Sequence, residues 1–222
     1  SRSDFDLGHR VSIFDSKKFT YLKGNMATTF SVVYNGQSGS AFSYVYSNGP
    51  VRDQGTSESN DLIFIPTAAQ ISAMTFVTNS SFPLSPAQQA AALENYIAQD
   101  NYLSKNRGKY AERNGARLPF TNIIDVKFVQ DFNVKIYNKK YQFQLTYDVF
   151  NFTNMLNRNW GRTYFMSNDQ TSLIKYQGAT GSTVPSYSFA PVANNTPWGI
   201  SSSTAPSYSA RWVSQLGLRF KF

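Results

Sequence analysis

The stretch that decides the fold is residues 214–222, SQLGLRFKF, which alternates strictly between apolar and polar positions. Its apolar residues are Leu216, Leu218, Phe220 and Phe222. A period of two places these side chains on one face of an extended strand, whereas a helix would need a period of 3.6. The segment therefore predicts a β-strand with one apolar face, and its last residue is aromatic.

Four earlier segments alternate in the same way. They cover about residues 7–19, 26–36, 120–132 and 141–151. In the third of these, Val126 and Phe128 lie on one face and Asp125 and Lys127 on the other. The sequence therefore predicts five amphipathic strands.

The connections between these strands alternate in length. Tight turns follow the first and third strands, whereas long loops cover about residues 37–118 and 154–208. In an antiparallel meander all short turns then lie at one end of the strands, which is typical of a transmembrane β-barrel with its long loops outside the cell. The apolar face would meet lipid. The polar face, which would meet the lumen, carries Arg211, Arg219, Lys221, Asp125, Lys127, Gln144 and Asp148.

A soluble β-sandwich has alternating strands too, and it is the alternative. Aromatic residues near the strand ends favour the membrane barrel, because barrels carry aromatic girdles there; these residues are Tyr21, Phe120, Phe132, Tyr141 and Phe222. Five strands are too few to close a barrel, since small closed barrels use about eight. We therefore expect residues 1–222 to be the C-terminal part of one larger barrel domain, unable to fold alone.

The first long loop contains one expected short helix. Ser85 is the expected N-cap, Pro86 and Gln88 fit the first turn, and Leu93, Tyr96 and Ile97 form an apolar stripe. The second long loop scatters aromatic rings among hydroxyl and amide side chains, which suits substrate contact or packing between loops. The candidate substrate-contact residues are Tyr44, Tyr46, Trp160, Tyr164 and Trp198.

The composition limits which kinds of functional site the chain can contain. The chain has 222 residues, no cysteine, one histidine and a net charge of +8. Lys and Arg are dispersed, so no nucleic-acid partner is expected. No arrangement predicts catalysis at His9, no phosphate-binding glycine loop precedes a helix, and Asp53, Glu58 and Asp61 are poorly spaced for calcium. We expect no enzyme activity, no cofactor and no metal.

Four segments together resemble a known family. They read YNGQSGSAFSYVYSNG from Tyr34, NDLIFIP from Asn60, YLSKNRGKYAERNGARLPFTNIIDVKFVQDF from Tyr102 and YDVFNFTNMLNRNWG from Tyr147. They resemble the end of large TonB-dependent outer-membrane receptors, of the type with a carboxypeptidase-regulatory-like domain before the plug. The resemblance covers nearly the whole chain.

This resemblance implies the last five strands of a barrel of about 22 strands. It also implies active import across the cell outer membrane of a substrate bound outside. The implied partners are the rest of the barrel and its plug, which this chain lacks, the TonB complex, the lipid bilayer and the barrel-assembly machinery. Leu218, Phe220 and Phe222 would be the signal that this machinery reads. The alternatives are a soluble aromatic-rich β adhesin or carbohydrate-binding module, and a passive porin.

Overall fold

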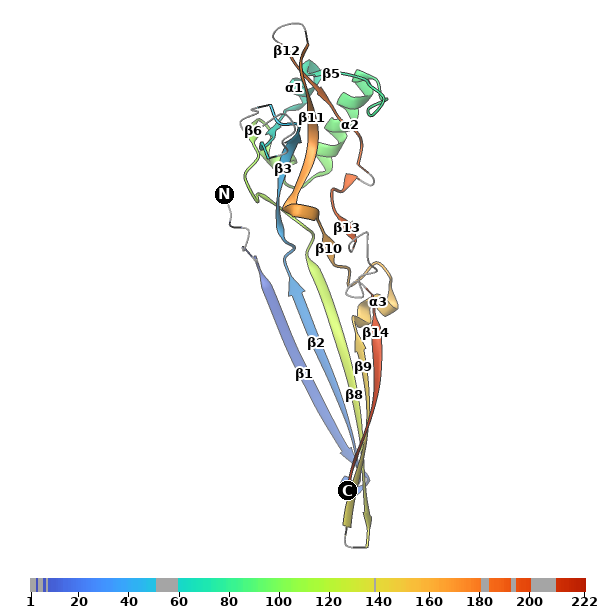
Figure 1. The fold of residues 1–222 in the computed structure, drawn as a ribbon. Helices are drawn as coiled ribbons and strands as arrows, with labels where there is room; N and C mark the ends of the chain where they lie inside the picture. Colours follow the sequence, from blue (N-terminus) through green and yellow to red (C-terminus); the bar gives the residue numbers. More distant parts are fainter. Residues whose placement is uncertain are drawn as a thin grey trace. The chain divides into compact units, whose positions relative to one another are not determined.

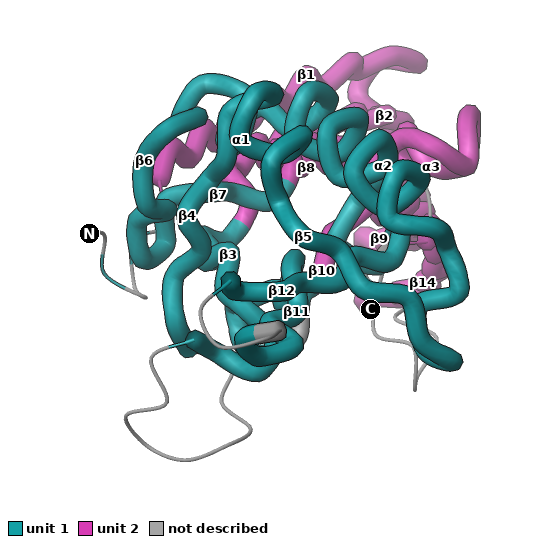
Figure 2. Tube along the Cα trace, turned by 90° about the horizontal axis from the view of Figure 1, so that it is seen from above, with its two compact units in different colours: residues 1–6, 40–118, 166–199 teal, residues 7–39, 119–165, 200–222 magenta. Residues whose placement is uncertain are grey.

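The fold is mainly β, with 51% strand and 18% helix. The computed structural model describes residues 3, 6, 8–50, 60–137, 139–180, 184–192, 195–200 and 211–222. The chain forms two compact units, coloured in Figure 2. Unit 1 contains Ser1–Asp6, Ser40–Leu118 and Met166–Gly199, and unit 2 contains Leu7–Gly39, Pro119–Phe165 and Ile200–Phe222.

Unit 2 is built on an antiparallel sheet whose five strands are neighbours in chain order (Figure 1). The strands are β1 (Arg10–Tyr21), β2 (Met26–Gln37), β8 (Thr121–Ile136), β9 (Lys139–Phe150) and β14 (Val213–Lys221). This order confirms the five predicted strands and the alternation of short and long connections. The described residues form no closed barrel.

The strand register confirms the two predicted faces. Val32, Val126 and Val149 are aligned across β2, β8 and β9 on what we call the apolar face. On the opposite, polar face, Lys127 lies opposite Asp148, and their side chains are 2.9 Å apart.

The apolar face also holds a small polar cluster. The Tyr21 hydroxyl lies 2.9 Å from the Thr28 hydroxyl and donates to Gln130 Oε1 at 3.0 Å, and Thr28 donates to the same oxygen at 2.6 Å. The three groups satisfy one another, so their presence on this face does not leave polar atoms unpaired.

Unit 2 has almost no buried core. Of the described apolar side chains in this unit, only Ala27, Val126 and Val149 are buried. Much of the apolar face is instead exposed or half-exposed, and Leu216 and Leu218 are 67% and 68% exposed. The predicted assembly residues Leu218, Phe220 and Phe222 are all exposed, and their role in assembly stays a prediction.

Unit 1 contains a second five-stranded sheet, which the sequence analysis did not predict. Its order is β5-β12-β11-β3-β7. Its strands are β3 (Ala41–Ser47), β5 (Thr75–Phe76), β7 (Ala116–Arg117), β11 (Gln170–Thr180) and β12 (Val184–Ser188). β3 and β11 pair in parallel, from Gln170 opposite Ser43 to Lys175 opposite Ser47, and so join the two long connections. The larger part of each long connection, Ser40–Leu118 and Met166–Gly199, therefore belongs to one compact unit.

The smaller elements complete the two units. They are β4 (Phe64–Ile65), paired with β6 (Lys109–Tyr110), α1 (Ala68–Ala73), α2 (Pro86–Gln99), α3 (Phe152–Leu156), β10 (Tyr164–Phe165), β13 (Gly199–Ile200), and the 3-10 turns η1 (Leu22–Gly24), η2 (Ser104–Asn106) and η3 (Ser167–Asp169). No helix in the described part of the chain is both long enough and apolar enough to cross a membrane.

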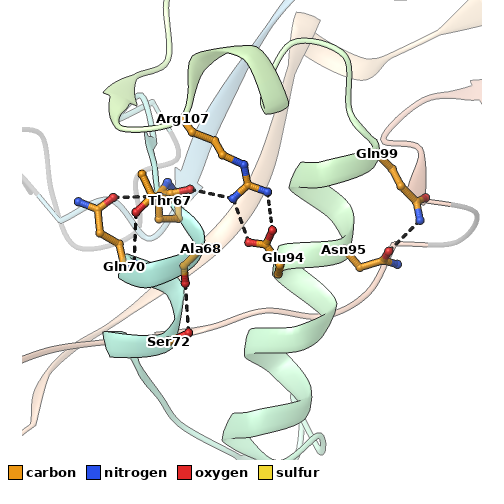
Figure 3. Close-up of polar contacts among 9 residues, drawn as sticks. Thr67, Ala68, Gln70, Ser72, Glu94, Asn95, Gln99 and Arg107 are labelled. Atoms are coloured by element: carbon orange, nitrogen blue, oxygen red, sulfur yellow. Dashed lines mark hydrogen bonds and ion pairs between the residues drawn. The ribbon is translucent and has the colours of Figure 1, made fainter.

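Helix α2 is the predicted helix, and its start and its apolar stripe are confirmed. Ser85 caps it through the Gln88 backbone nitrogen, Gln88 completes the capping box, and Leu93, Tyr96 and Ile97 are buried. Glu94 of this helix forms a bidentate ion pair with Arg107 (Figure 3). Arg107 Nη2 donates to Glu94 Oε1 at 2.7 Å, and Nη1 donates to Oε2 at 2.9 Å. Arg107 also donates to the Pro66 carbonyl, which lies just before α1.

A pH prediction follows from the tyrosines in the core of unit 1. Tyr44 is fully buried and donates to Asp100 Oδ2 at 2.6 Å. Burial is the main cause that raises its pKa, and burial raises the pKa of Tyr46 and of Tyr96 to about 12. An unfolded tyrosine ionises near pH 10. Between pH 10 and 12 the unfolded chain therefore loses protons that the folded unit retains, so the contribution of these tyrosines to stability is constant below pH 10 and falls above it.

The expected result is that unit 1 unfolds cooperatively as the pH rises from 10 to 12, with the absorbance of the buried tyrosines, as tyrosinates, appearing in the same transition. Ultraviolet absorbance and near-ultraviolet circular dichroism of the full-length protein check this. Gradual tyrosinate formation near pH 10, with the circular dichroism unchanged, would contradict the placement of these hydroxyls.

Candidate ligand-binding site

The candidate site is a pocket of about 330 Å³ in unit 2, at the end of the sheet where the long connections leave it. Phe120 and Asn122 line it at the start of β8, and Thr153 lines it from α3. The remaining lining residues are Asn159, Trp160, Gly161, Arg162 and Tyr164. The pocket thus combines aromatic rings, amides and one cation.

Hydrogen bonds from two asparagine side chains stabilise the conformation of residues 151–161, which line part of the pocket. Asn151 adopts a left-handed conformation, its backbone nitrogen donates to Asp125 Oδ1 at 2.8 Å, and its side-chain amide donates to the Gly161 carbonyl at 2.8 Å. Asn154 donates to the Trp160 carbonyl, also at 2.8 Å. Asparagine tolerates this backbone conformation better than most residues, and its amide replaces hydrogen bonds that a regular element would supply.

Aromatic rings face solvent at this pocket. Trp160 is 54% exposed and Phe120 is 44% exposed, although the Trp160 backbone is held by a hydrogen bond to the Asn157 carbonyl. Asn122 accepts a hydrogen bond from the Tyr34 hydroxyl at 2.7 Å, so its side chain is oriented. A ring on a fixed backbone can stack on a flat ligand with little loss of conformational entropy.

Arg162 supplies the positive charge of the pocket. Its Nε donates to the Arg158 carbonyl at 3.0 Å and its Nη2 donates to Asn159 Oδ1, which together orient the guanidinium. No carboxylate pairs with Arg162 among the described residues. An oriented, unpaired guanidinium can bind a carboxylate or phosphate group of a ligand.

The structure brings together two of the five predicted contact residues, Trp160 and Tyr164. The prediction that Tyr44 and Tyr46 contact substrate is corrected. Both rings are buried in the core of unit 1 and present almost no surface to a ligand. Trp198 is half-buried in unit 1, edge-on to Phe42 with ring centroids 6.3 Å apart. Arg162 lines the pocket but was not among the predicted contact residues. The run Asn-Arg-Asn-Trp-Gly-Arg that ends at Arg162 was the available signal, since it places two cations and two amides beside a tryptophan.

Both acidic groups expected on the polar face have partners within unit 2. Asp148 pairs with Lys127, and Asp125 accepts a hydrogen bond from the Asn151 backbone nitrogen.

Comparison with known proteins adds no family assignment. No family model, curated protein or solved structure matches this chain. Among the described residues no group of three or more His, Asp or Glu side chains is arranged to hold a metal ion. Asp53 and Glu58, from the segment considered for calcium, lie outside the described residues. The geometry of the sheet and of the pocket is therefore the basis for a functional proposal.

A prediction tests how the pocket is held. Gly161 has φ +59°, and a methyl group there would overlap the Asn151 side chain. Gly161→Ala is expected to displace Asn151 and to speed hydrogen exchange of residues 151–162 about hundredfold, because left-handed strain and overpacking together cost about 3 kcal/mol. Gly108→Ala is the control, since Gly108 has φ +77° but a methyl there makes only ordinary contacts. If both substitutions accelerated local hydrogen exchange equally, the overlap with the Asn151 side chain would not contribute to the effect of Gly161→Ala.

Proposed function

We propose that this chain provides five adjacent wall strands of a larger closed barrel in the outer membrane. The complete protein acts as a TonB-dependent receptor that actively imports a substrate bound on the extracellular side. The Trp160 pocket is part of the binding surface, and it suits a ligand with a flat face and an anionic group. The proposal assigns no catalysis to this chain.

The observation that carries the proposal is the exposed apolar face of the unit 2 sheet. Leu216 and Phe220 on β14 are continued across the sheet by aromatic neighbours on β9 and β8, and Leu218 is continued by Leu145 on β9. An apolar surface of this extent on a protein in water would promote association, whereas in a bilayer it is the contact surface. The opposite face carries charge pairs suited to a wet lumen, including Lys127 with Asp148.

Strand length agrees with a membrane span. β1, β2 and β9 each have 12 residues. At about 3.3 Å per residue such a strand is about 40 Å long, and at a tilt of about 40° it covers about 30 Å along the membrane normal. This matches the thickness of the hydrocarbon core, which is about 30 Å.

The sheet edges support closure by further strands. β1 and β14 each have one partner strand among those described, so each has an open edge. Unpaired backbone groups are not tolerated in lipid, which is why strands cross membranes as closed barrels. The proposed neighbours are the rest of the barrel and its plug, and the proposed external partners are the TonB complex and the barrel-assembly machinery.

Membrane fractionation tests the proposal. The full-length protein is expected in the outer-membrane fraction and is expected to resist extraction by salt or carbonate. Its electrophoretic mobility is expected to change after heating, as is typical of folded barrels. Recovery in a soluble periplasmic fraction, with cooperative unfolding in the absence of detergent, would overturn the proposal and favour a soluble adhesin or carbohydrate-binding module.

A further inference from the structure

Two charged side chains lie on the apolar face of the unit 2 sheet in the middle of β1. Asp15 is aligned with Val32 and Lys17 with Phe30, so the strand register places both charges on this face. Both residues are exposed. In the middle of β14, at the opposite edge of the sheet, the same face carries only leucine and phenylalanine. The charges are therefore a local exception, confined to one edge of the apolar face.

Neither charge is neutralised by another described residue. The Asp15 carboxylate accepts a hydrogen bond from the Ser16 backbone nitrogen at 2.9 Å, but no lysine or arginine of the described residues forms an ion pair with it. The Lys17 ammonium lies 5.5 Å from the centroid of the Phe19 ring, and no described carboxylate pairs with it. Both groups are thus available to a partner outside the described residues.

A lipid bilayer alone does not accommodate these two charges. On the lipid-facing side of a barrel a lysine is strongly unfavourable near the midplane, and an aspartate is unfavourable to a smaller extent. The hydrocarbon core is about 30 Å thick, so its surface is about 15 Å from the middle of a spanning strand, which is farther than a lysine side chain extends. Lipid headgroups therefore cannot reach Asp15 or Lys17, and we expect protein to cover this part of the face.

The spacing of the charges favours a second copy of the same chain as the cover. Asp15 and Lys17 have opposite signs and lie about 7 Å apart along one face of the strand. A two-fold axis along the membrane normal that passes between them brings Asp15 of each copy within reach of Lys17 of the other. The surface is thus complementary to itself, as a two-fold interface requires, whereas a different protein would need a matching pair of its own.

The residues around the charges suit such an interface. Val11, Ile13 and Phe19 lie on the same face of β1 and are about half exposed. Apolar contacts alone give little association within a membrane, because lipid tails are as apolar as these side chains. Ion pairs are stronger in this setting than in water, because the dielectric constant is low. The charge pairs therefore supply the specificity of the contact, and the apolar residues around them exclude water.

We infer that the complete protein forms a two-fold symmetric dimer in the outer membrane through this face of β1. Two ion pairs join the copies, each between Asp15 of one copy and Lys17 of the other. The barrel strand that pairs with the open edge of β1 lies in the plane of the sheet, beside the charges and not over them. The inference rests on the proposed function, because it requires the sheet to lie in a bilayer.

Native mass spectrometry of the full-length protein in detergent tests this inference. The parent protein is expected to be a dimer. Lys17→Asp and Asp15→Lys are each expected to raise the dissociation constant of the dimer about hundredfold or more, because each change makes both charge contacts repulsive. Mixing the two variants is expected to restore a dimer that contains one copy of each, since every contact then joins opposite charges again.

A matched pair of neutral substitutions separates the two faces of the strand. Lys18 follows Lys17 in the sequence but lies on the polar face, where it pairs with Asp131 at 3.8 Å. Lys17→Gln is expected to weaken the dimer about tenfold, whereas Lys18→Gln is expected to leave it unchanged. Asp15→Leu with Lys17→Leu is the variant least prone to misfold, because it places apolar side chains on the apolar face. It is expected to insert as well as the parent and to be a monomer.

Outer-membrane fractionation and the heat-dependent shift on electrophoresis are recorded for each variant, so that insertion and association are measured separately. Three results overturn the inference and leave the proposed function intact: an inserted parent that is a monomer or is bound to a different polypeptide, a dimer that persists in the Asp15→Leu, Lys17→Leu variant, and equal weakening by Lys17→Gln and Lys18→Gln. Failure of the mixed variants to associate also overturns it. Recovery of the parent in a soluble fraction overturns both the inference and the proposed function.

Discussion

Leu145→Arg is expected to reduce sharply the amount of full-length protein in the outer membrane. Leu145 lies in the middle of β9 on the apolar face, aligned with Gln130 on β8 and Leu218 on β14. An arginine facing lipid near the bilayer midplane costs about 2–4 kcal/mol. Outer-membrane yield in cells and the free energy of unfolding of refolded protein in lipid vesicles both measure this cost.

Gln144→Arg is the matched control, one residue away on the polar face. Gln144 donates to Asp131 Oδ1 at 2.7 Å, and an arginine there could donate to the same carboxylate. Its cross-strand neighbour Arg219 opposes the added charge, so we expect a net cost below about 1 kcal/mol. Equal yields and equal unfolding free energies for the two variants would show that the faces are assigned wrongly, or that this sheet does not contact lipid.

Gln89→Ala is expected to release α2 from the rest of unit 1. Gln89 is fully buried, and its amide nitrogen donates to the carbonyls of Val77 and Leu84 at 3.0 and 2.9 Å. Its Oε1 accepts the Phe189 backbone nitrogen at 2.9 Å, which ties the first long connection to the second. Alanine would leave these groups unpaired in the interior, at a cost of about 3–5 kcal/mol.

Hydrogen exchange of residues 90–99 in the full-length protein measures this effect. A loss of about 3 kcal/mol raises exchange through local opening by about hundredfold or more. Gln88→Ala is the control, because Gln88 is exposed and only completes the capping box, so about 1 kcal/mol is expected. If Gln89→Ala changed exchange no more than Gln88→Ala, the three hydrogen bonds would not be what joins the two connections.

The alternation of apolar and polar residues was sufficient to predict the unit 2 sheet. Its strands are antiparallel, and their order in the sheet follows their order in the chain, so a period of two and the length of each connection were enough to predict their order and faces. The local signals of α2 were equally sufficient, because Ser85, Pro86 and Gln88 act on their own backbone within one turn. In both cases the interactions that fix the structure lie between residues that are near in sequence or that repeat regularly.

The remaining features depend on contacts that form when the chain packs. β11 carries Leu173 and Ile174 in adjacent positions among polar residues, and its parallel partner β3 lies more than 120 residues earlier, so neither a repeating pattern nor a turn indicates the pair. Tyr44 and Gln89 look suited to a surface by residue type, yet both are buried, because Asp100 and three backbone groups satisfy their polar atoms inside unit 1. The Trp160 pocket depends on the Asn151 amide, which must reach the carbonyl of Gly161 ten residues later. Such contacts between distant residues arise only when the chain packs, because the partners that make a buried polar group or a parallel strand favourable are absent from its local sequence.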